Sequence, residues 1–460
     1  MYQIDFNKPI HIHFIGIGGI SMSGLAEILL QENFTISGSD SKESEITGLL
    51  TGLGATVVIG QAAENISDDI DLVVYTAAIH PDNPEYAAAV AKQIPMLTRA
   101  QLLGQIMANY RYPIAVSGTH GKTTTTSMLT HILLDADTDP TISVGGMLDA
   151  IGGNIRVGKS EYFVTEACEY TNSYHAFNPR ISIILNVDAD HLDFFSGIEE
   201  IIQSFKTFAN KLPNDGTLVI NGDMDCLPII TEALPAKVVT FGLSESCNYC
   251  AKDITYNDLG YPSYTPVVNG NARETISLHV NGLHNVLNSL AAIATADILG
   301  IDSANIVSGL AKFGGAKRRF ELKGYMNDVM IIDDYAHHPT EIKATLTAAK
   351  QTEHNEIWCV FQPHTYTRTK ALLPDFAEAL HLADHVVLTK IYAAREKDTG
   401  MVSSQDIADI LENTYHTDVI YLTTFDEAIT YLKKNCKKND LLITMGAGDV
   451  VNIGEELLKK

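Results

Sequence analysis

Short apolar runs alternate with longer amphipathic segments along almost the whole chain. The short runs are typical of buried strands, and the longer segments have the spacing of helices. Helices are predicted over 22–31, 127–134, 289–299 and 342–350. Strands are predicted over 10–15, 35–39, 55–59, 72–75, 114–116, 162–165, 181–185, 217–220, 238–241, 329–332, 356–361, 386–388 and 441–445. This alternation predicts an α/β fold in which helices connect parallel strands.

Three domains are predicted from the length and from two breaks in this pattern. A chain of 460 residues is long enough for about three domains of roughly 150 residues each. The first domain is expected over 1–109, the central domain over 110–323 and the third over 324–460. Within the central domain, residues 143–147 are predicted to form a loop.

The first strand is followed by a glycine-rich turn, Gly16-Ile17-Gly18-Gly19-Ile20-Ser21, and then by a helix. Asp40 ends the second strand, as in the Rossmann arrangement of nucleotide-binding domains. Ser21 stands where the dinucleotide fingerprint has its third glycine, so the pattern favours a nucleotide or diphosphate without indicating NAD. The candidate substrate-binding residues are Gly18, Gly19, Ser21 and Asp40.

The second domain opens with a strand, a tight turn and a helix, and the turn reads Gly118-Thr119-His120-Gly121-Lys122-Thr123-Thr124. Glycines let backbone N–H groups approach phosphate oxygens, and the helix N-terminus adds partial positive charge. Lys122 is expected to contact the β- and γ-phosphates of ATP, and the Thr123 hydroxyl is a candidate Mg²⁺ ligand. The spacing is shorter than in the common P-loop, which disfavours a generic kinase or GTPase. A plain strand–turn–helix corner is the alternative.

Acidic and imidazole side chains follow the next strands of this domain. Glu166 and His191 are predicted to lie beside the phosphate turn, because ligands of open α/β sheets bind at the carboxyl ends of the strands. With Thr123 they form a candidate metal site for Mg²⁺, and the imidazole would also suit Mn²⁺.

Other charged residues of the central domain allow two interpretations. The acids Glu169, Asp188 and Asp190 either belong to the site or are helix caps and solvated loop charges, and we favour the second interpretation for Asp188. Arg318 and Arg319 either neutralise phosphates or form a solvated basic turn.

The third domain places a polar cluster after each of four predicted strands, at 333–341, 362–370, 391–396 and 446–449. Because parallel strands end at one edge of a sheet, this edge is predicted to be a binding face. Asn285 and Asn288 of the central domain lie three residues apart on one predicted helical face, where their amides would suit an adenine edge or bound water. A helix cap and a surface amide are the alternative.

Charge and composition narrow the choice of partners. The chain has 32 basic and 56 acidic residues and a formal net charge of −24, which disfavours nucleic acid or an anionic membrane as a partner. No apolar run approaches the roughly 20 residues of a membrane-spanning helix, and residues 1–9 lack a signal-peptide core. A cytoplasmic protein is expected, either a monomer or a dimer. The 6 scattered cysteines argue against a disulfide scaffold.

Taken together, these stretches resemble the Mur ligase family, whose members add amino acids during peptidoglycan synthesis. The resemblance runs nearly end to end, and its most specific parts are Asp334-Tyr335-Ala336-His337-His338-Pro339 and Gln362-Pro363-His364-Thr365-Tyr366-Thr367-Arg368. It implies a Rossmann-like N-terminal domain that binds a UDP-sugar, a central P-loop ATPase-like domain, and a C-terminal Rossmann-like α/β domain that closes over the site.

The resemblance also implies a reaction and a set of residues. L-alanine would be joined to the lactyl carboxylate of UDP-N-acetylmuramate through an acyl phosphate, with ATP cleaved to ADP and phosphate. The residues implied to contact ATP are Asn285, Asn288, Arg319 and Asp334. Those implied to position L-alanine are Tyr335, His337, His364 and Arg368, with Arg368 on its carboxylate. His364 is either a candidate to take the amine proton or a packed, hydrogen-bonding histidine. The catalytic candidates are Lys122, Glu166, His191, His364 and Arg368.

Three alternatives stay open at this point. A sister ligase that attaches a preformed peptide to UDP-N-acetylmuramate shares most of these motifs. A nicotinamide-dependent oxidoreductase would use the turn at 16–21 but would leave Lys122 and Thr123 without a role. A non-catalytic nucleotide sensor would bind ATP without turning it over.

Overall fold

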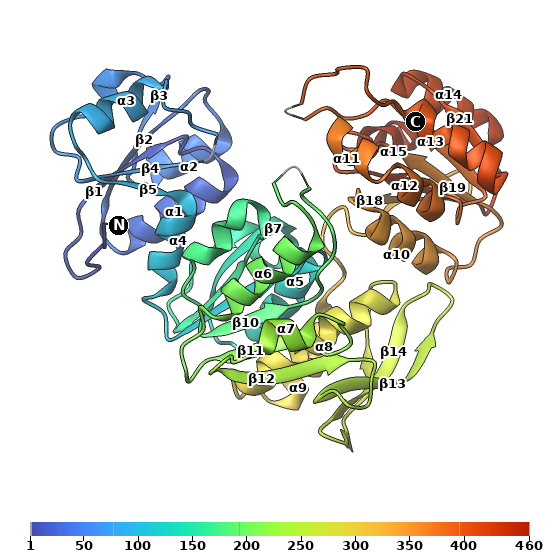
Figure 1. The fold of residues 1–460 in the computed structure, drawn as a ribbon, viewed down its shortest axis with the longest axis horizontal. Helices are drawn as coiled ribbons and strands as arrows, with labels where there is room; N and C mark the ends of the chain where they lie inside the picture. The colour runs from blue at the N-terminus through green and yellow to red at the C-terminus, as the bar shows by residue number, and fades with distance from the viewer. Residues whose placement is uncertain (1, 77, 193, 395, 460) are drawn as a thin grey trace.

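The computed structural model describes residues 2–76, 78–192, 194–394 and 396–459. Three sheets built mainly from parallel strands, each covered by helices, follow one another along the chain (Figure 1). The predicted α/β fold is therefore confirmed.

The first sheet is parallel and has the strand order β3-β2-β1-β4-β5. Its strands are β1 (His11–Ile15), β2 (Thr35–Asp40), β3 (Thr56–Ile59), β4 (Leu72–Tyr75) and β5 (Met96–Thr98). The helices are α1 (Ile20–Gln31), η1 (Ala63–Asn65), α2 (Glu45–Gly52), α3 (Pro84–Ala91) and α4 (Arg99–Met107). On α1, Leu25, Ile28 and Leu29 share one face and are buried in the same core as β1, which explains the helical spacing in the sequence.

The middle sheet has 11 strands, and its centre is parallel in the order β12-β11-β10-β6-β9-β7. The strands are β6 (Tyr112–Ser117), β7 (Thr141–Leu148), β8 (Gly153–Arg156), β9 (Tyr162–Glu166), β10 (Ile181–Ile184), β11 (Thr217–Asn221), β12 (Lys237–Gly242), β13 (Tyr249–Tyr256), β14 (Pro262–Val268), β15 (Asn271–Ala272) and β16 (Ile276–Ser277). The helices are α5 (Lys122–Asp135), η2 (Asp149–Ile151), η3 (Tyr170–Ala176), α6 (Ile198–Ala209), α7 (Leu227–Thr231), α8 (Leu283–Ile298) and α9 (Ser303–Lys312).

One local prediction in this domain is wrong. Residues 143–147 were expected to form a loop but belong to β7, which pairs with β9 in parallel and with β8 in antiparallel. The regular pairing with β9 ends at Ser143, and the pairing with β8 is irregular between Ser143 and Leu148. Gly145 and Gly146 lie in this irregular stretch, where the Gly145 N–H donates to Glu166 Oε1 at 2.6 Å.

The third sheet has the order β17-β18-β22-β19-β20-β21. Only β17 is antiparallel to its neighbour, so the carboxyl ends of the other strands share one edge. The strands are β17 (Glu321–Met326), β18 (Val329–Asp334), β19 (Ile357–Phe361), β20 (His385–Leu388), β21 (Asp418–Tyr421) and β22 (Leu441–Met445). The helices are α10 (Pro339–Ala349), α11 (Tyr366–Ala371), α12 (Leu373–Leu380), α13 (Ser404–Ile410), η4 (Leu411–Tyr415), α14 (Phe425–Asn435) and α15 (Val451–Leu458).

The domain boundaries after residues 109 and 323 stay predictions, although the third sheet already includes Glu321 at the start of β17. Within the described residues, every helix falls short of the length and apolarity that crossing a membrane requires. The cysteine thiols of that part of the chain are all free.

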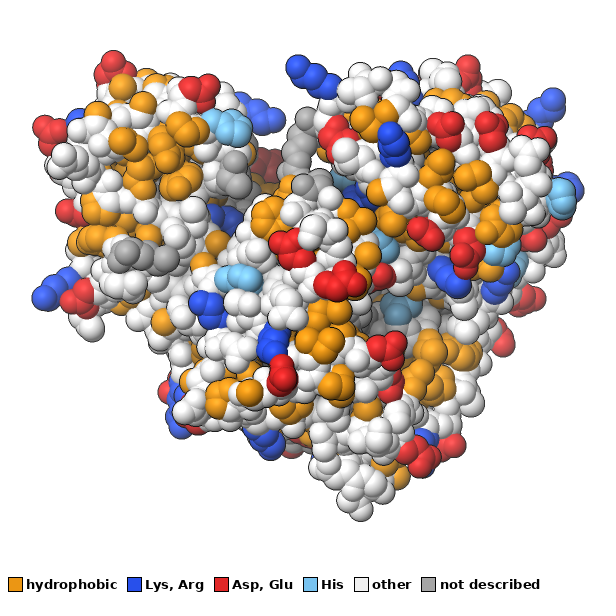
Figure 2. All heavy atoms as spheres, viewed as in Figure 1, with side chains coloured by type: hydrophobic (Ala, Val, Ile, Leu, Met, Phe, Trp, Pro, Cys, Tyr) orange, Lys and Arg blue, Asp and Glu red, His pale blue; other side chains and the backbone are white. Residues whose placement is uncertain are grey.

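The first and third domains lie on the same side of the middle domain and are separated by an open gap (Figures 1 and 2). The first domain packs tightly on the middle one. A Cβ at Gly104 in α4 would overlap the carbonyl oxygen of Ala176, and a Cβ at Gly24 in α1 would overlap the side chain of Ile155. Asn178 Nδ2 also donates to the Gly104 carbonyl oxygen at 2.9 Å.

Candidate active site

The phosphate turn connects β6 to α5 and has a fixed shape. Gly118 and Gly121 have φ angles of 139° and 85°, which residues with a Cβ rarely adopt. A Cβ at Gly121 would also lie 2.6 Å from Asn288 Oδ1. Asn186 holds the turn, because its Oδ1 accepts a hydrogen bond from the His120 backbone N–H at 2.7 Å. The turn therefore has the glycines that a close phosphate approach requires.

Lys122 is charged and lies against the turn. Its ammonium donates to the carbonyl oxygens of Gly118 at 2.6 Å and Thr119 at 3.0 Å, and to Glu169 Oε2 at 3.0 Å. Burial lowers the pKa of Lys122, but the acidic groups around it, Glu169 foremost, together outweigh burial and raise this pKa above its usual value. The Glu169 side chain is only 3% exposed. Its interpretation as a cap or a solvated charge is therefore wrong, and it neutralises a buried cation.

Glu166 ends β9, and its carboxylate borders the cavity in front of the turn. Oε1 accepts a hydrogen bond from the Gly145 N–H at 2.6 Å. A Cβ at Gly145 would lie 2.7 Å from Glu166 Oε2, so this glycine makes room for the carboxylate. Thr123, Glu166 and His191 line one cavity of about 700 Å³ together with Lys122. The structure thus brings the three candidate metal ligands to the phosphate turn, and their metal binding stays a prediction.

His191 follows β10 and packs against the Tyr170 ring in a tilted arrangement, with ring centroids 4.7 Å apart. Its Nε2 lies 3.9 Å from an oxygen of Glu169 and from one of Asp190. Burial lowers the pKa of His191, so the ring is neutral near pH 7. A neutral imidazole has the lone pair that a metal ligand needs.

A second cavity, of about 260 Å³, extends from the turn towards α8 and mixes polar and apolar walls. Asn288 Nδ2 donates to Asn285 Oδ1 at 3.0 Å, and Asn285 Nδ2 donates to the Asn281 carbonyl oxygen at 2.7 Å. The other predicted ATP residues, Arg319 and Asp334, line the same cavity. Its apolar walls come from Leu185, Phe241, Leu287 and Phe320. Amide edges beside apolar walls fit a planar heterocycle such as adenine.

A third cavity, of about 360 Å³, contains all the residues implied to position L-alanine: Tyr335, His337, His364 and Arg368. His337 Nδ1 lies 3.1 Å from the Tyr335 carbonyl oxygen, and Arg368 Nη1 lies 3.0 Å from His364 Nδ1. Burial lowers the pKa of His337 to about 4, so this ring is neutral near pH 7. Because guanidinium groups only donate, the Nδ1 of His364 must accept.

Ion pairs connect the third domain to the middle domain at these cavities. Arg368 Nη2 and Nε lie 2.8 and 3.1 Å from Asp190 Oδ1. Burial raises the pKa of Asp190, but Arg368, through its charge and hydrogen bonds, and the neighbouring groups together outweigh burial, and the pKa is lowered overall. Asp188 accepts a hydrogen bond from Thr340 Oγ1 and pairs with His120 at 3.4 Å. Asp188 was predicted to be a cap or solvated charge; that prediction is wrong, because it joins two domains.

The two arginines of the 317–319 segment differ in role. Arg318 donates from Nε to Asp333 Oδ2 at 2.9 Å and from both Nη atoms to the carbonyl oxygens of Gly446 and Gly448. Its guanidinium is bonded within the third domain, so a solvated turn is wrong for Arg318. Arg318 also lines the 700 Å³ cavity, and a phosphate-binding role stays a prediction. Arg319 borders both the 700 Å³ and the 260 Å³ cavities.

The candidate substrate residues of the first domain lie apart from these cavities. Gly18 donates from its backbone N–H to Asp40 Oδ2 at 2.9 Å, across the carboxyl ends of β1 and β2. Gly19 and Ser21 are exposed at the same edge. Their place at this edge is the one at which Rossmann-like domains bind nucleotides, and their role stays a prediction.

Glu341 is a central residue that the sequence analysis left without a role. Its carboxylate lies 3.2 Å from His120 Nδ1, 3.3 Å from His337 Nδ1 and 3.7 Å from Arg319 Nη1. These charges outweigh burial and hold the pKa of Glu341 well below its usual range. The one local signal was its position four residues after His337, which lies just before α10.

Family models match nearly all of the chain. The model described as Mur ligase family, catalytic domain, matches residues 11–111, and the Mur ligase middle domain matches residues 116–296. The model described as Mur ligase, glutamate ligase domain, matches residues 318–448. The chain belongs to the Mur ligase family. The resemblance of its motifs is thereby confirmed.

Relatives of this Mur ligase match it over its full length. A UDP-N-acetylmuramate–L-alanine ligase of Agathobacter rectalis is 59% identical over 460 residues, with 100% of both chains covered. The ligase of the same name from Clostridium perfringens is 50% identical over 455 residues, covering 99% of this chain and 98% of that one.

Two solved structures have a similar fold. A UDP-N-acetylmuramate–alanine ligase from Thermotoga maritima is 30% identical with a TM-score of 0.78, and 98% of each chain is covered. A murein peptide ligase from Psychrobacter arcticus is 26% identical with a TM-score of 0.69 and the same coverage.

Proposed function

We propose that this Mur ligase joins L-alanine to the lactyl carboxylate of UDP-N-acetylmuramate and cleaves ATP to ADP and phosphate. The full-length relatives at 50–59% identity support this reaction. The observation that carries it is the 360 Å³ cavity, small enough for an amino acid, which shares Asp190, His191, Tyr335 and His337 with the cavity of the phosphate turn. An amine and an activated carboxyl group can meet there.

The reaction brings two anions together, ATP and a carboxylate. Lys122 and Arg319 line the phosphate cavity and supply positive charge. The oxygen donors of Thr123 and Glu166, and the neutral ring of His191, fit Mg²⁺ or Mn²⁺. When bound, the metal would add positive charge at the phosphates. The carboxylate would then attack the γ-phosphate to give an acyl phosphate, and the amine of L-alanine would displace the phosphate.

The hydrogen bonds of the 360 Å³ cavity suggest how the amino acid is held. Arg368 is placed to receive the carboxylate of L-alanine. The ring of His364 accepts from Arg368 through Nδ1, so we assign it a positioning role rather than the role of base. His337 donates through Nδ1 to the Tyr335 carbonyl oxygen. Its Nε2 lone pair is therefore the better acceptor for an amine proton.

The test is ADP formation by the full chain with Mg²⁺ and ATP. We expect ADP only when UDP-N-acetylmuramate and L-alanine are both present. ADP formation with UDP-N-acetylmuramate and the tripeptide, but not with L-alanine, would favour the sister ligase. This chain is 26% identical to the murein peptide ligase and 59% identical to an L-alanine ligase, which favours ADP formation with L-alanine. Tight NADH binding without ADP formation would contradict the proposal.

A further inference from the structure

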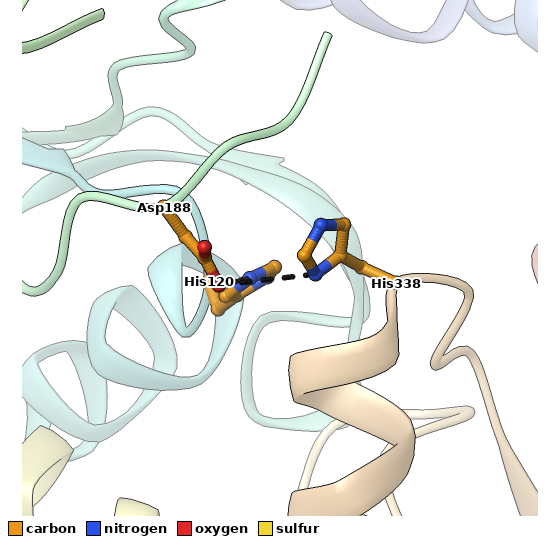
Figure 3. Close-up of side chains that lie close together, drawn as sticks. All are labelled: His120, Asp188 and His338. Carbon is orange, nitrogen blue, oxygen red and sulfur yellow. Dashed lines mark ion pairs between the residues drawn. The ribbon is translucent and has the colours of Figure 1, made fainter. Parts of the chain in front are cut away.

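Two histidines and an aspartate converge where the middle and third domains meet (Figure 3). His120 belongs to the phosphate turn, Asp188 follows β10, and His338 directly precedes α10. His120 Nε2 lies 3.4 Å from Asp188 Oδ2, and His338 Nδ1 lies 3.8 Å from the same oxygen. One ligand atom from each residue lies within 4.8 Å of the other two. The sequence analysis assigned no role to this combination.

The neighbours of each ring determine which nitrogen can act as a ligand. His120 Nδ1 lies 3.2 Å from a Glu341 oxygen, and a carboxylate only accepts, so Nδ1 carries the proton. His120 Nε2 is buried and has no hydrogen-bond partner among the described residues. His338 Nε2 lies 3.1 Å from the Ala189 carbonyl oxygen, so this nitrogen donates. Its Nδ1 accepts only a long hydrogen bond, of 3.3 Å, from the Thr340 N–H.

We propose that His120, Asp188 and His338 form a binding site for a divalent transition metal, with Zn²⁺ as the best match. Metal-ligating histidines donate their second N–H to a carboxylate or a backbone carbonyl, and both rings already do so. Zinc–nitrogen bonds of about 2.0–2.1 Å place tetrahedral ligand atoms about 3.3 Å apart. The two separations from Asp188 Oδ2 are 3.4 and 3.8 Å, and the two imidazole nitrogens lie within 4.8 Å of each other. Metal binding therefore requires the ligand atoms to draw together.

This site differs from the candidate Mg²⁺ site in ligands and in consequence. Two imidazoles and one carboxylate favour transition metals over Mg²⁺, which prefers oxygen. Because His338 comes from the third domain and the other ligands from the middle domain, a bound metal links the domains. The geometry also allows a proton instead of a metal, on His120 between the carboxylates of Asp188 and Glu341. The experiment below distinguishes a bound metal from this proton.

The experiment titrates Co²⁺ and Zn²⁺ into the chelator-treated full chain without nucleotide. Tetrahedral Co²⁺ gives a visible absorption band, and calorimetry follows Zn²⁺. We expect a single tight equivalent, and at least about tenfold weaker binding in His338→Asn. Asparagine keeps an acceptor for the Thr340 N–H, so α10 retains its cap. Asp188→Asn, which changes a partly exposed side chain, provides a second variant if His338→Asn fails to fold.

Two control variants locate the bound metal. Glu166→Gln removes a candidate Mg²⁺ ligand, and His80→Ala removes an exposed histidine of the first domain; both should bind like the native chain. Equal affinity in the native chain, His338→Asn and Asp188→Asn would overturn the proposal. Loss of binding in Glu166→Gln would also overturn it, because the metal would then lie at the phosphate cavity. If the native chain bound no metal at all, the proton on His120 would be the occupant, and the proposal would be wrong.

Discussion

Replacing Lys122 with alanine should cost stability as well as activity. Lys122 and Glu169 form a buried pair at 3.0 Å, and the Glu169 side chain is 3% exposed. Without the ammonium, a buried carboxylate loses its partner. Breaking such a pair from one side costs about 3–5 kcal/mol. Lys122→Ala should therefore lower the free energy of unfolding of the middle domain by that amount, and ligation should be abolished.

The double variant separates the two effects. In Lys122→Met/Glu169→Gln no buried charge is left unpaired, and neutral replacements of buried ion pairs are often tolerated. We expect most of the lost stability to return, while ligation stays abolished because no cation faces the phosphates. Lys312→Ala is the matched control. Lys312 also pairs with an aspartate of this domain, but its side chain is 62% exposed, so the cost should stay below about 1 kcal/mol.

Urea unfolding followed by two signals gives the answer. Far-UV circular dichroism reports on all three domains. Fluorescence reports on the third domain, because the single tryptophan of the chain is Trp358 in β19. The circular dichroism transition of Lys122→Ala should move to lower urea, with little change in fluorescence. An unchanged transition in Lys122→Ala, or a double variant as unstable as the single one, would refute the reasoning.

Three further changes test other parts of the site. Burial raises the pKa of Asp334 from 3.8 to about 6, so its contribution to stability is complete below pH 3.8 and is lost as the pH rises through 6. Between pH 4 and pH 7 the free energy of unfolding of Asp334→Asn, measured by urea unfolding, should rise by up to about 3 kcal/mol relative to that of the native chain. A difference between the two proteins that does not change with pH would contradict this. Gly121→Ala combines a φ of 85° with a clash against Asn288, so calorimetry should show at least about tenfold weaker binding of an ATP analogue; native affinity would count against it. Asp190→Asn removes the partner of Arg368 between two domains, and X-ray scattering should give a larger radius of gyration, whereas superimposable profiles would show that this pair does not hold the domains together.

The elements and the phosphate turn could be predicted because their signals are local. Apolar runs and helical spacing are properties of neighbouring residues. The lysine and glycines of 118–123 occupy fixed places in one turn. β7 was missed because two glycines weaken its pattern, and because its pairing beyond Ser143 is irregular.

The charges at the domain junction could not be assigned from the sequence. Asp188 and Thr340 are 152 positions apart, and Asp190 and Arg368 are 178 apart. Nothing in the local sequence of Asp188 distinguishes a loop carboxylate from an interdomain contact. The ion pair of Arg318 with Asp333 could not be assigned either, because Asp333 belongs to a strand whose position the sequence does not give.

The backbone contact at Gly104 limits how the enzyme can move. The backbone of Gly104 in α4 lies directly against the backbone of Ala176, with no side chain between them. If the first domain slid over the middle domain, these main-chain atoms would collide. The first two domains should consequently travel as one rigid body. Motion then reduces to a swing of the third domain about 313–320, the peptide between α9 and β17, where Gly315, Arg318 and Phe320 have left-handed backbones. A compound wedged against residues 313–316 would block this swing at a distance from Arg319 and Phe320, the residues of the peptide that line the ATP cavity.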